Sequence, residues 1–144
     1  MSEEKTYSGG CFCGAVEFAV SGAPVVMGYC HCESCRHWSA GPVTAFSLWA
    51  PEALQFTKGE DNILSYNKTD NSFRKSCKTC GGHLYTDHKP MGLVDIYPAV
   101  ITDIVFEPTM HVFYGESVLS IKDGLPKFKD LPEQAGGSGE MLSE

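Results

Sequence analysis

The spacing of the cysteines constrains this chain more than any other feature of its sequence. The seven cysteines form a pair, a triple and a second pair, namely Cys11 and Cys13, then Cys30, Cys32 and Cys35, then Cys77 and Cys80. Spacings this short let thiolates converge on one metal ion, because a tight turn points both sulfurs into the same space. The pattern therefore predicts metal binding.

The last pair lies in the stretch Cys77-x-x-Cys80-Gly81-Gly82. Glycine after the second cysteine allows a positive φ and offers backbone N–H groups to the sulfurs, which is the shape of a zinc knuckle. A redox pair is the alternative. It is disfavoured because a redox Cys-x-x-Cys belongs at a helix N-terminus after a strand, whereas the following HLYTDH is typical of a strand.

The cysteine count divides naturally as four plus three. A structural zinc takes four ligands, so two pairs make one all-cysteine site. Spacing alone does not fix which groups join. The middle group could give two thiols to a structural site and leave one free, and one zinc with three loose cysteines is the remaining alternative.

If the two outer pairs share one zinc, the ion closes a loop of roughly sixty residues, and its binding free energy becomes folding free energy. Cys30, Cys32 and Cys35 would then hold a second zinc with an open position, which is the mark of a catalytic site. Three thiolates donate much electron density. Such a zinc therefore favours a thiolate or alkoxide over a reactive hydroxide, and a thiol substrate fits that preference.

Short alternating segments bounded by Gly, Pro, Asn and Asp predict strands. They cover residues 14–20, 25–30, 43–49, 53–59, 63–68, 72–77, 83–88, 92–101 and 110–115. Only a turn or so of helix fits before Gly41-Pro42, so the cysteine triple is expected at a strand-to-turn corner. The pattern indicates a mostly β fold of several sheets and not a βαβ array.

Length and composition bound the remaining possibilities. The 144 residues predict one domain over 1–130, and the sparse apolar content of 131–144 predicts a flexible tail. No segment has the apolar length to span a bilayer, and the acidic N-terminus lacks a signal-peptide core, so a cytoplasmic location is expected. A net charge of −7 and a pI near 5.1 argue against a nucleic-acid partner.

Four stretches together resemble the glutathione-dependent formaldehyde-activating enzyme family, whose relatives include centromere protein V. They are GGCFCGAV, YCHCESCRHWSAGP, RKSCKTCGG and MHVFYGESVLSIKDGLPKF, and they cover roughly residues 9 to 128. The resemblance implies a zinc-stapled, multi-sheet β fold akin to the Rab-interacting guanine-exchange factors, the zinc-bound β-tent architecture. It also implies two Zn²⁺ ions per chain, a structural one on Cys11, Cys13, Cys77 and Cys80 and a catalytic one on Cys30, Cys32 and Cys35.

The activity that the family implies forms or cleaves a carbon–sulfur bond between glutathione and formaldehyde, giving S-hydroxymethylglutathione. The hypothesis is therefore a zinc-dependent carbon–sulfur lyase or synthase acting on a small thiol–aldehyde adduct. A non-catalytic zinc module that binds a protein partner is the rival. Fold and metal site do not fix the substrate, the general acid or base, or the oligomeric state.

Several other residues have both a functional and a structural interpretation. His31 could be a fourth ligand or a proton shuttle, or its ring could point away from the metal, supporting the ligands or facing solvent. Arg36 and His37 could attract the carboxylates of a glutathione-like thiol or be ordinary polar residues at a corner. The aromatics could wall a pocket or belong to the core: Trp38, Phe46 and Trp49.

Histidines and a turn outside the cysteine groups are expected to be structural. His83, His88 and His111 lie in strand patterns, where a packed or surface histidine is expected. Asp123-Gly124 with Leu125-Pro126 is typical of a turn that closes the fold.

Overall fold

The computed structural model describes residues 4–144, and these residues divide into two compact units. The first unit holds residues 4–25 and 47–106, and the second holds residues 26–46 and 107–144. The single domain expected over 1–130 stays a prediction. Each of the two cysteine groups described below lies within one unit.

One sheet of the first unit has three antiparallel strands in the order β1-β2-β5. These are β1 (Thr6–Gly10), β2 (Glu17–Ser21) and β5 (Leu54–Lys58). The loop between β1 and β2 carries the first cysteine pair. Pairing of β1 with β2 therefore brings both ends of that loop together.

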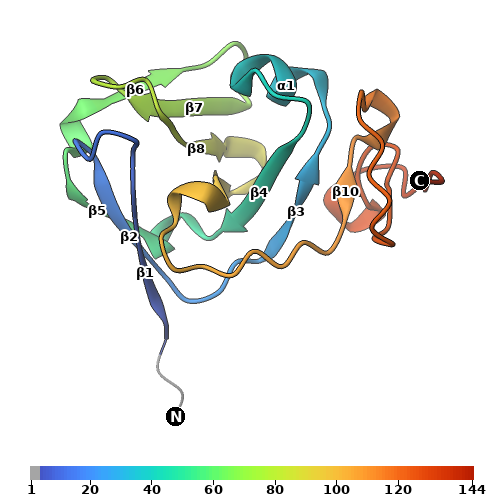
Figure 1. Ribbon diagram of the computed structural model, residues 1–144, viewed down its shortest axis with the longest axis horizontal. Helices are drawn as coiled ribbons and strands as arrows, with labels where there is room; N and C mark the ends of the chain where they lie inside the picture. The colour runs from blue at the N-terminus through green and yellow to red at the C-terminus, as the bar shows by residue number, and fades with distance from the viewer. Residues whose placement is uncertain (1–3) are drawn as a thin grey trace. The chain divides into compact units, whose positions relative to one another are not determined.

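The other strands of the first unit, together with the end of β4 from residue 47 onward, form an antiparallel series in the order β4-β9-β8-β7-β6, of which Figure 1 labels all but β9. They are β4 (Thr44–Trp49), β9 (Leu93–Ile96), β8 (His83–His88), β7 (Ser72–Cys77) and β6 (Ile63–Tyr66). Four 3₁₀ turns lie in the connections: Pro51–Ala53, Glu60–Asn62, Lys89–Met91 and Pro98–Val100. The last cysteine pair lies where β7 ends, with Cys77 in the strand and Cys80 in the turn that follows.

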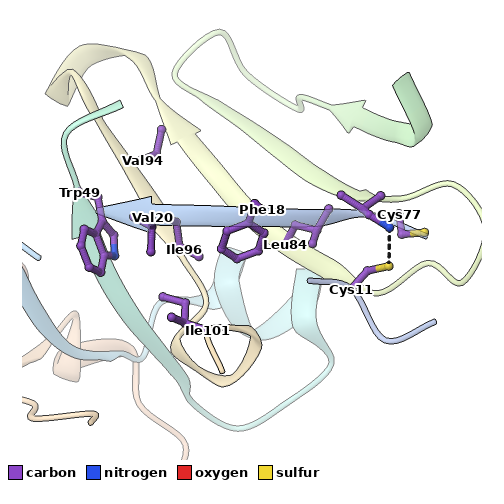
Figure 2. Close-up of a cluster of buried hydrophobic side chains, with 10 residues drawn as sticks. Cys11, Phe18, Val20, Trp49, Cys77, Leu84, Val94, Ile96 and Ile101 are labelled. Carbon is purple, nitrogen blue, oxygen red and sulfur yellow. Dashed lines mark hydrogen bonds between the residues drawn. The ribbon is translucent and has the colours of Figure 1, made fainter. Parts of the chain in front are cut away.

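The core of the first unit follows from the alternation of β2, whose Phe18 and Val20 are both buried. Figure 2 shows Trp49 near one end of β2 and the sulfurs of Cys11 and Cys77 near the other. Full burial of an aliphatic or aromatic side chain stabilises a fold by about 1.5–3 kcal/mol. Cys11 and Cys77 belong to this packed apolar cluster and lie at one end of it.

The second unit places a parallel strand beside the strand that carries Cys30. Its elements are β3 (Val26–Cys30), α1 (Glu33–Ser39), β10 (His111–Val112) and two 3₁₀ turns at Tyr114–Glu116 and Glu133–Ala135. β10 pairs in parallel with β3, which sets Val112 opposite Cys30 (Figure 1). A Cβ on Gly28 would lie 2.5 Å from the carbonyl oxygen of Met110, so this close approach requires glycine.

The segment after residue 130 makes specific backbone contacts with the chain that precedes it. The N–H of Leu142 donates to the carbonyl of Lys127 at 2.7 Å, and the N–H of Lys129 donates to the carbonyl of Glu140 at 2.8 Å. The flexibility expected of residues 131–144 stays a prediction, for which amide exchange is the direct measurement.

The mostly β, multi-sheet fold is confirmed. The strand predicted over 92–101 ends at Ile96, because Pro98 lacks the N–H that a central strand needs. The strand predicted over 110–115 is only two residues long, since Phe113 adopts φ 54°. Within residues 4–144, no helix combines the length and the apolar character that crossing a membrane requires.

Candidate metal centres

The first candidate centre joins the two outer cysteine pairs within the first unit. Cys11 and Cys13 come from the loop between β1 and β2, Cys77 ends β7, and Cys80 lies in the turn before β8. The Sγ atoms of Cys11 and Cys13 are 3.7 Å apart, and those of Cys13 and Cys77 are 3.8 Å apart. Zinc–sulfur bonds of about 2.3 Å in a tetrahedron separate the sulfurs by about 3.8 Å. The observed spacing therefore fits a tetrahedral ion.

Backbone N–H groups point at the sulfurs of this centre. The N–H of Val16 donates to Cys11 Sγ at 3.3 Å, and the dashed line in Figure 2 reaches that sulfur. The N–H of Thr79 donates to Cys77 Sγ, and the N–H of Gly82 donates to Cys80 Sγ, both at 3.3 Å. Gly81 has φ +76°, the conformation predicted for the knuckle. Such donors stabilise thiolate charge and orient metal ligands.

The thiols of this centre perturb one another in opposite directions. The N–H of Gly82 lowers the pKa of Cys80 to about 6. The backbone of Ala15 acts to lower the pKa of Cys13, but desolvation and the neighbouring thiols, Cys80 foremost, raise it to about 11. Four thiolates this close repel one another, so the sulfurs can all ionise together only around a cation.

The second candidate centre is the cysteine triple, and it lies within the second unit. Cys30 ends β3, Cys32 is the N-cap of α1, and Cys35 lies in the first turn of α1. Their sulfurs lie within 4.8 Å of one another, and the N–H of Cys35 donates to Cys32 Sγ at 3.3 Å. The triple lies at a corner, as expected, but the corner leads from a strand into a seven-residue helix and not into a turn. One helical turn brings the second and third cysteines onto the same face.

The ligand set of the triple contains sulfur alone. Among residues 4–144, no histidine or carboxylate joins the three sulfurs in a mutually close group. Hydrogen bonds with Cys32 and Cys35, together with burial, raise the pKa of Cys30 far above its ordinary value. Three convergent thiolates therefore need a positive ion, and soft sulfur donors suit zinc among the common metals.

His31 is fully buried and does not face solvent, so the solvent-facing alternative is wrong. Its Nε2 lies 2.8 Å from Nδ1 of His111, which is also fully buried, as expected for a packed histidine. Burial, followed by the charge of His111, lowers the pKa of His31 to about 4. The ring is therefore neutral at neutral pH and is packed behind the ligands that flank it.

The residues predicted to bind substrate are placed differently from one another. Arg36 donates from Nε to the carbonyl of His31 at 3.1 Å and from Nη2 to the carbonyl of Glu116 at 3.0 Å. His37 is exposed. Trp49 is fully buried in the core of the first unit, where its Nε1 donates to Ser47 Oγ at 2.9 Å. The structure thus favours the core alternative for Trp49, and substrate contact by the other two stays a prediction.

Sequence reasoning missed the most unusual charged residue, Lys127, whose side chain is fully buried. Its Nζ donates to Asp123 Oδ1 at 2.5 Å and to Glu144 Oε2 at 3.0 Å. Asp123 Oδ2 in turn lies 2.8 Å from His111 Nε2. No spacing pattern in the sequence predicts these contacts. The only available signal was the position of Asp123 and Lys127 in the last of the stretches that resemble the family.

Three comparisons with known proteins bear on this geometry. The family model described as glutathione-dependent formaldehyde-activating enzyme matches residues 6–116. A Schizosaccharomyces pombe protein named as an uncharacterized lyase is 32% identical over 79 residues, which are 55% of this chain and 56% of that protein. The alignment thus spans little more than half the length of that curated relative.

The solved structure of a Rhodobacter sphaeroides protein shares the fold. It is similar with a TM-score of 0.58 at 20% sequence identity, over 68% of this chain and 90% of that one. The family match covers most of the chain and includes all seven cysteines. The chain therefore belongs to the glutathione-dependent formaldehyde-activating enzyme family.

Proposed function

We propose that this protein is a zinc-dependent carbon–sulfur lyase or synthase acting on the adduct of a small thiol and an aldehyde. Glutathione and formaldehyde are the prototype pair, and S-hydroxymethylglutathione is the corresponding adduct. The observation that carries the proposal is the triple: three convergent sulfurs joined by no fourth protein ligand among residues 4–144. The family description and the lyase name of the yeast relative support the reaction class.

The two cysteine groups would have different roles. The outer pairs supply four ligands and would hold a structural zinc, which leaves no position for a substrate. Cys30, Cys32 and Cys35 would hold the reactive zinc and leave one tetrahedral position for a substrate atom. All seven cysteines are free thiols, the state that metal binding requires, and a reducing compartment such as the cytoplasm maintains that state.

The proposed reaction conserves atoms and charge. In the forward direction the thiol sulfur attacks the aldehyde carbon, so a carbon–sulfur bond forms and the carbonyl π bond breaks. The proton released by the thiol ends on the former carbonyl oxygen, and the reverse reaction breaks the same bond. When bound, a zinc ion would supply Lewis acidity that favours the thiolate or alkoxide form.

The side chains around the triple hold the corner from Cys30 to Cys35 in place. Hydrogen-bond donors used in this way are not free to bind a substrate. Arg36 donates two hydrogen bonds to the backbone carbonyls of His31 and Glu116. Its main effect is therefore to brace the ligand corner. The exposed His37, one residue further along α1, is the better candidate of the two for the carboxylates of a glutathione-like thiol.

Exchange NMR with labelled formaldehyde tests the function. The rate of adduct formation and cleavage is measured for glutathione and a panel of other thiols, with wild type, Cys35→Ser and Ser34→Ala. Ser34 is exposed and adjacent to the ligand, so its variant is the matched control. We expect wild type and Ser34→Ala to accelerate exchange and Cys35→Ser to lose the acceleration. If no thiol–aldehyde pair exchanges faster with wild type than with Cys35→Ser, the lyase proposal fails.

A partner-binding zinc module remains the second candidate, and one exposed side chain provides its test. Phe12 is 93% exposed between two cysteines of the four-cysteine centre. It lines a cavity of about 590 Å³ in the first unit, together with Gly82 and His83. A single exposed apolar side chain is normal on a protein surface, so Phe12 serves this alternative only as the position at which it is tested. Under this alternative, wild type accelerates no exchange reaction, and Phe12→Ser weakens binding to a protein partner without changing the metal content.

A further inference from the structure

A continuous series of polar contacts leads from the cysteine triple to the last turn of the second unit. His31 bonds to His111, His111 bonds to Asp123, and Asp123 bonds to Lys127. We call these four residues the polar chain. Three of the four side chains are fully buried, and Asp123 lies at the surface end.

Every proton of the buried ammonium group has an acceptor. Lys127 Nζ donates to Asp123 Oδ1 at 2.5 Å, to the carbonyl of Leu125 at 3.0 Å and to Glu144 Oε2 at 3.0 Å. Although desolvation acts to raise the pKa of Asp123, its bonds to Lys127 and His111 hold that pKa well below its usual range. The Lys127–Asp123 end of the network resists movement, because movement would leave a charged group unpaired, whereas Nδ1 of His31 at the inner end is buried without a hydrogen-bond partner among the described residues.

The inner end of the polar chain is attached directly to the ligand corner. His31 lies between Cys30 and Cys32, and its backbone N–H donates to the carbonyl of Val112 at 3.0 Å. Its ring also meets Tyr114 edge-on, with the centroids 4.8 Å apart. Backbone and ring are thus both fixed by residues 111–114. Rotation of the His31 ring would break its contacts with His111 and Tyr114 and so release the backbone between Cys30 and Cys32 from one of its anchors.

The triple needs such support more than the four-cysteine centre does. The four-cysteine centre has four ligands and several N–H donors to its sulfurs, whereas the triple has three ligands on a six-residue corner. A centre with fewer ligands depends on neighbouring hydrogen bonds to hold its geometry. Stability alone does not account for the polar chain, since apolar replacements of buried ion pairs are often neutral or stabilising.

We propose that the polar chain is a positioning element for the three-cysteine centre and holds the corner from Cys30 to Cys35 in the geometry that binds a metal ion. The inference rests on the proposed function only in taking these cysteines as metal ligands. Loss of a hydrogen-bonded partner behind a metal ligand typically lowers metal affinity about 10–100-fold. We expect that loss at the triple and no change at the four-cysteine centre.

The experiment compares variants along the polar chain in the full-length, zinc-loaded protein. Asp123→Asn breaks the ion pair, and His111→Phe keeps an aromatic ring stacked on Tyr29 but removes both polar contacts. His111→Gln is the conservative variant that can still bridge its two neighbours. Glu140→Gln is the matched control, because Glu140 pairs with Lys129 on the exposed surface of the same unit.

Two readouts separate positioning from general stability. Competition with a chromophoric chelator measures zinc affinity at each centre, and Cys35→Ser identifies the release phase that belongs to the triple. Cobalt(II) exchange reports the thiolate-to-metal absorption of the triple after subtraction of the Cys35→Ser spectrum. Both are recorded at low temperature, where circular dichroism shows each variant folded.

We expect Asp123→Asn and His111→Phe to weaken the triple about 10–100-fold and to change its cobalt spectrum, with partial recovery in His111→Gln and no effect of Glu140→Gln. Folded variants with wild-type affinity and spectrum would overturn the inference. If Asp123→Asn does not fold, the comparison of His111→Phe with His111→Gln decides the outcome, and equal zinc affinity and equal cobalt spectra in the two variants would overturn the inference. A wild type without exchange activity, combined with weakened variants, rejects the proposed function and leaves the positioning role intact.

Discussion

Among single residues, two buried ionisable side chains differ in how fully hydrogen bonds compensate for the loss of water around their charge. Lys127 has three acceptors for its three protons. Asp95 of the first unit accepts one bond, from the N–H of Ser47 at 3.2 Å, and its other oxygen lies 3.9 Å from His88 Nε2, which is too far for a hydrogen bond. Burial raises the pKa of Asp95. The ionised form of this carboxyl is therefore poorly supported.

This environment predicts the pH dependence of Asp95→Asn. A carboxyl whose pKa is higher in the folded than in the unfolded state contributes stability that is complete below about pH 4 and is lost as pH rises through the folded value. Asparagine does not titrate and can still accept from Ser47. We expect the variant to gain stability relative to wild type as pH rises above about 4, where the carboxyl of the unfolded wild type ionises.

Urea unfolding at several pH values measures this difference, with the fluorescence of the buried Trp49 as the probe. Metal dissociation at acid pH affects both proteins equally and cancels from the comparison. Parallel stability curves for wild type and Asp95→Asn would contradict the prediction.

At the scale of elements, the short helix that carries Cys35 ends in a strained conformation. α1 has only seven residues, too few to be stable alone. Its C-cap, Ala40, adopts φ 53° and ψ 40°, the left-handed region in which glycine is the usual residue. An alanine there costs about 1–2 kcal/mol relative to an unstrained conformation.

Ala40→Gly should therefore stabilise the protein by about 0.5–1 kcal/mol, the strain relief being partly offset by the greater freedom of glycine when unfolded. The converse substitution is Gly92→Ala. Gly92 caps a 3₁₀ turn at φ 65°, and a Cβ there meets no atom within 4 Å, so backbone strain is the only cost expected. It should destabilise by a similar amount. Urea midpoints measure both, and loss of stability in Ala40→Gly would refute the interpretation.

Strand prediction succeeded where turn residues mark the ends of a strand and failed where a strand depends on its partner. The strands at 72–77 and 83–88 have the predicted bounds, because Asn71 precedes the first and Gly82 and Pro90 flank the second. β1 was not predicted. Its sequence TYSGG has little strand propensity, and the strand exists because all five residues pair with β2.

At the scale of the whole molecule, the two centres differ in how much chain they connect. The contact between Cys13 and Cys77 joins residues 64 positions apart, whereas the triple lies within six residues of sequence. A link that closes a long loop removes far more unfolded-state entropy than a local one. The four-cysteine centre should therefore support folding, and the triple should not.

Substitution of one ligand in each centre tests this division. We expect two zinc ions per chain in wild type and one in Cys35→Ser, with an unchanged circular dichroism spectrum. Cys77→Ser should fail to fold, because structural zinc contributes about 10–16 kcal/mol, as much as the net stability of a domain. A single zinc in wild type would instead favour one ion with three loose cysteines, and an unfolded Cys35→Ser would reject the division.

The cysteine groups that the structure brings together could be predicted from sequence, because the spacing of possible metal ligands is local within each group. The two-unit organisation could not, because residues 26–46 belong to the second unit although they lie between the two segments of the first unit in the sequence. The polar chain was equally hidden. His31 and His111 are 80 positions apart, and a buried lysine resembles a surface lysine until its acceptors are known.

The sequence separation between the outer cysteine pairs also determines how long the first pair exists during synthesis before the second pair is made. A ribosome adding about 5–20 residues per second needs about 3–13 s to make the 64 residues between Cys13 and Cys77. During that interval Cys11 and Cys13 are nascent thiols without their partners, open to oxidation or to capture by the wrong metal. With zinc in the four-cysteine centre, as proposed, the supply of zinc at the moment when Cys80 emerges would limit how much newly made chain folds.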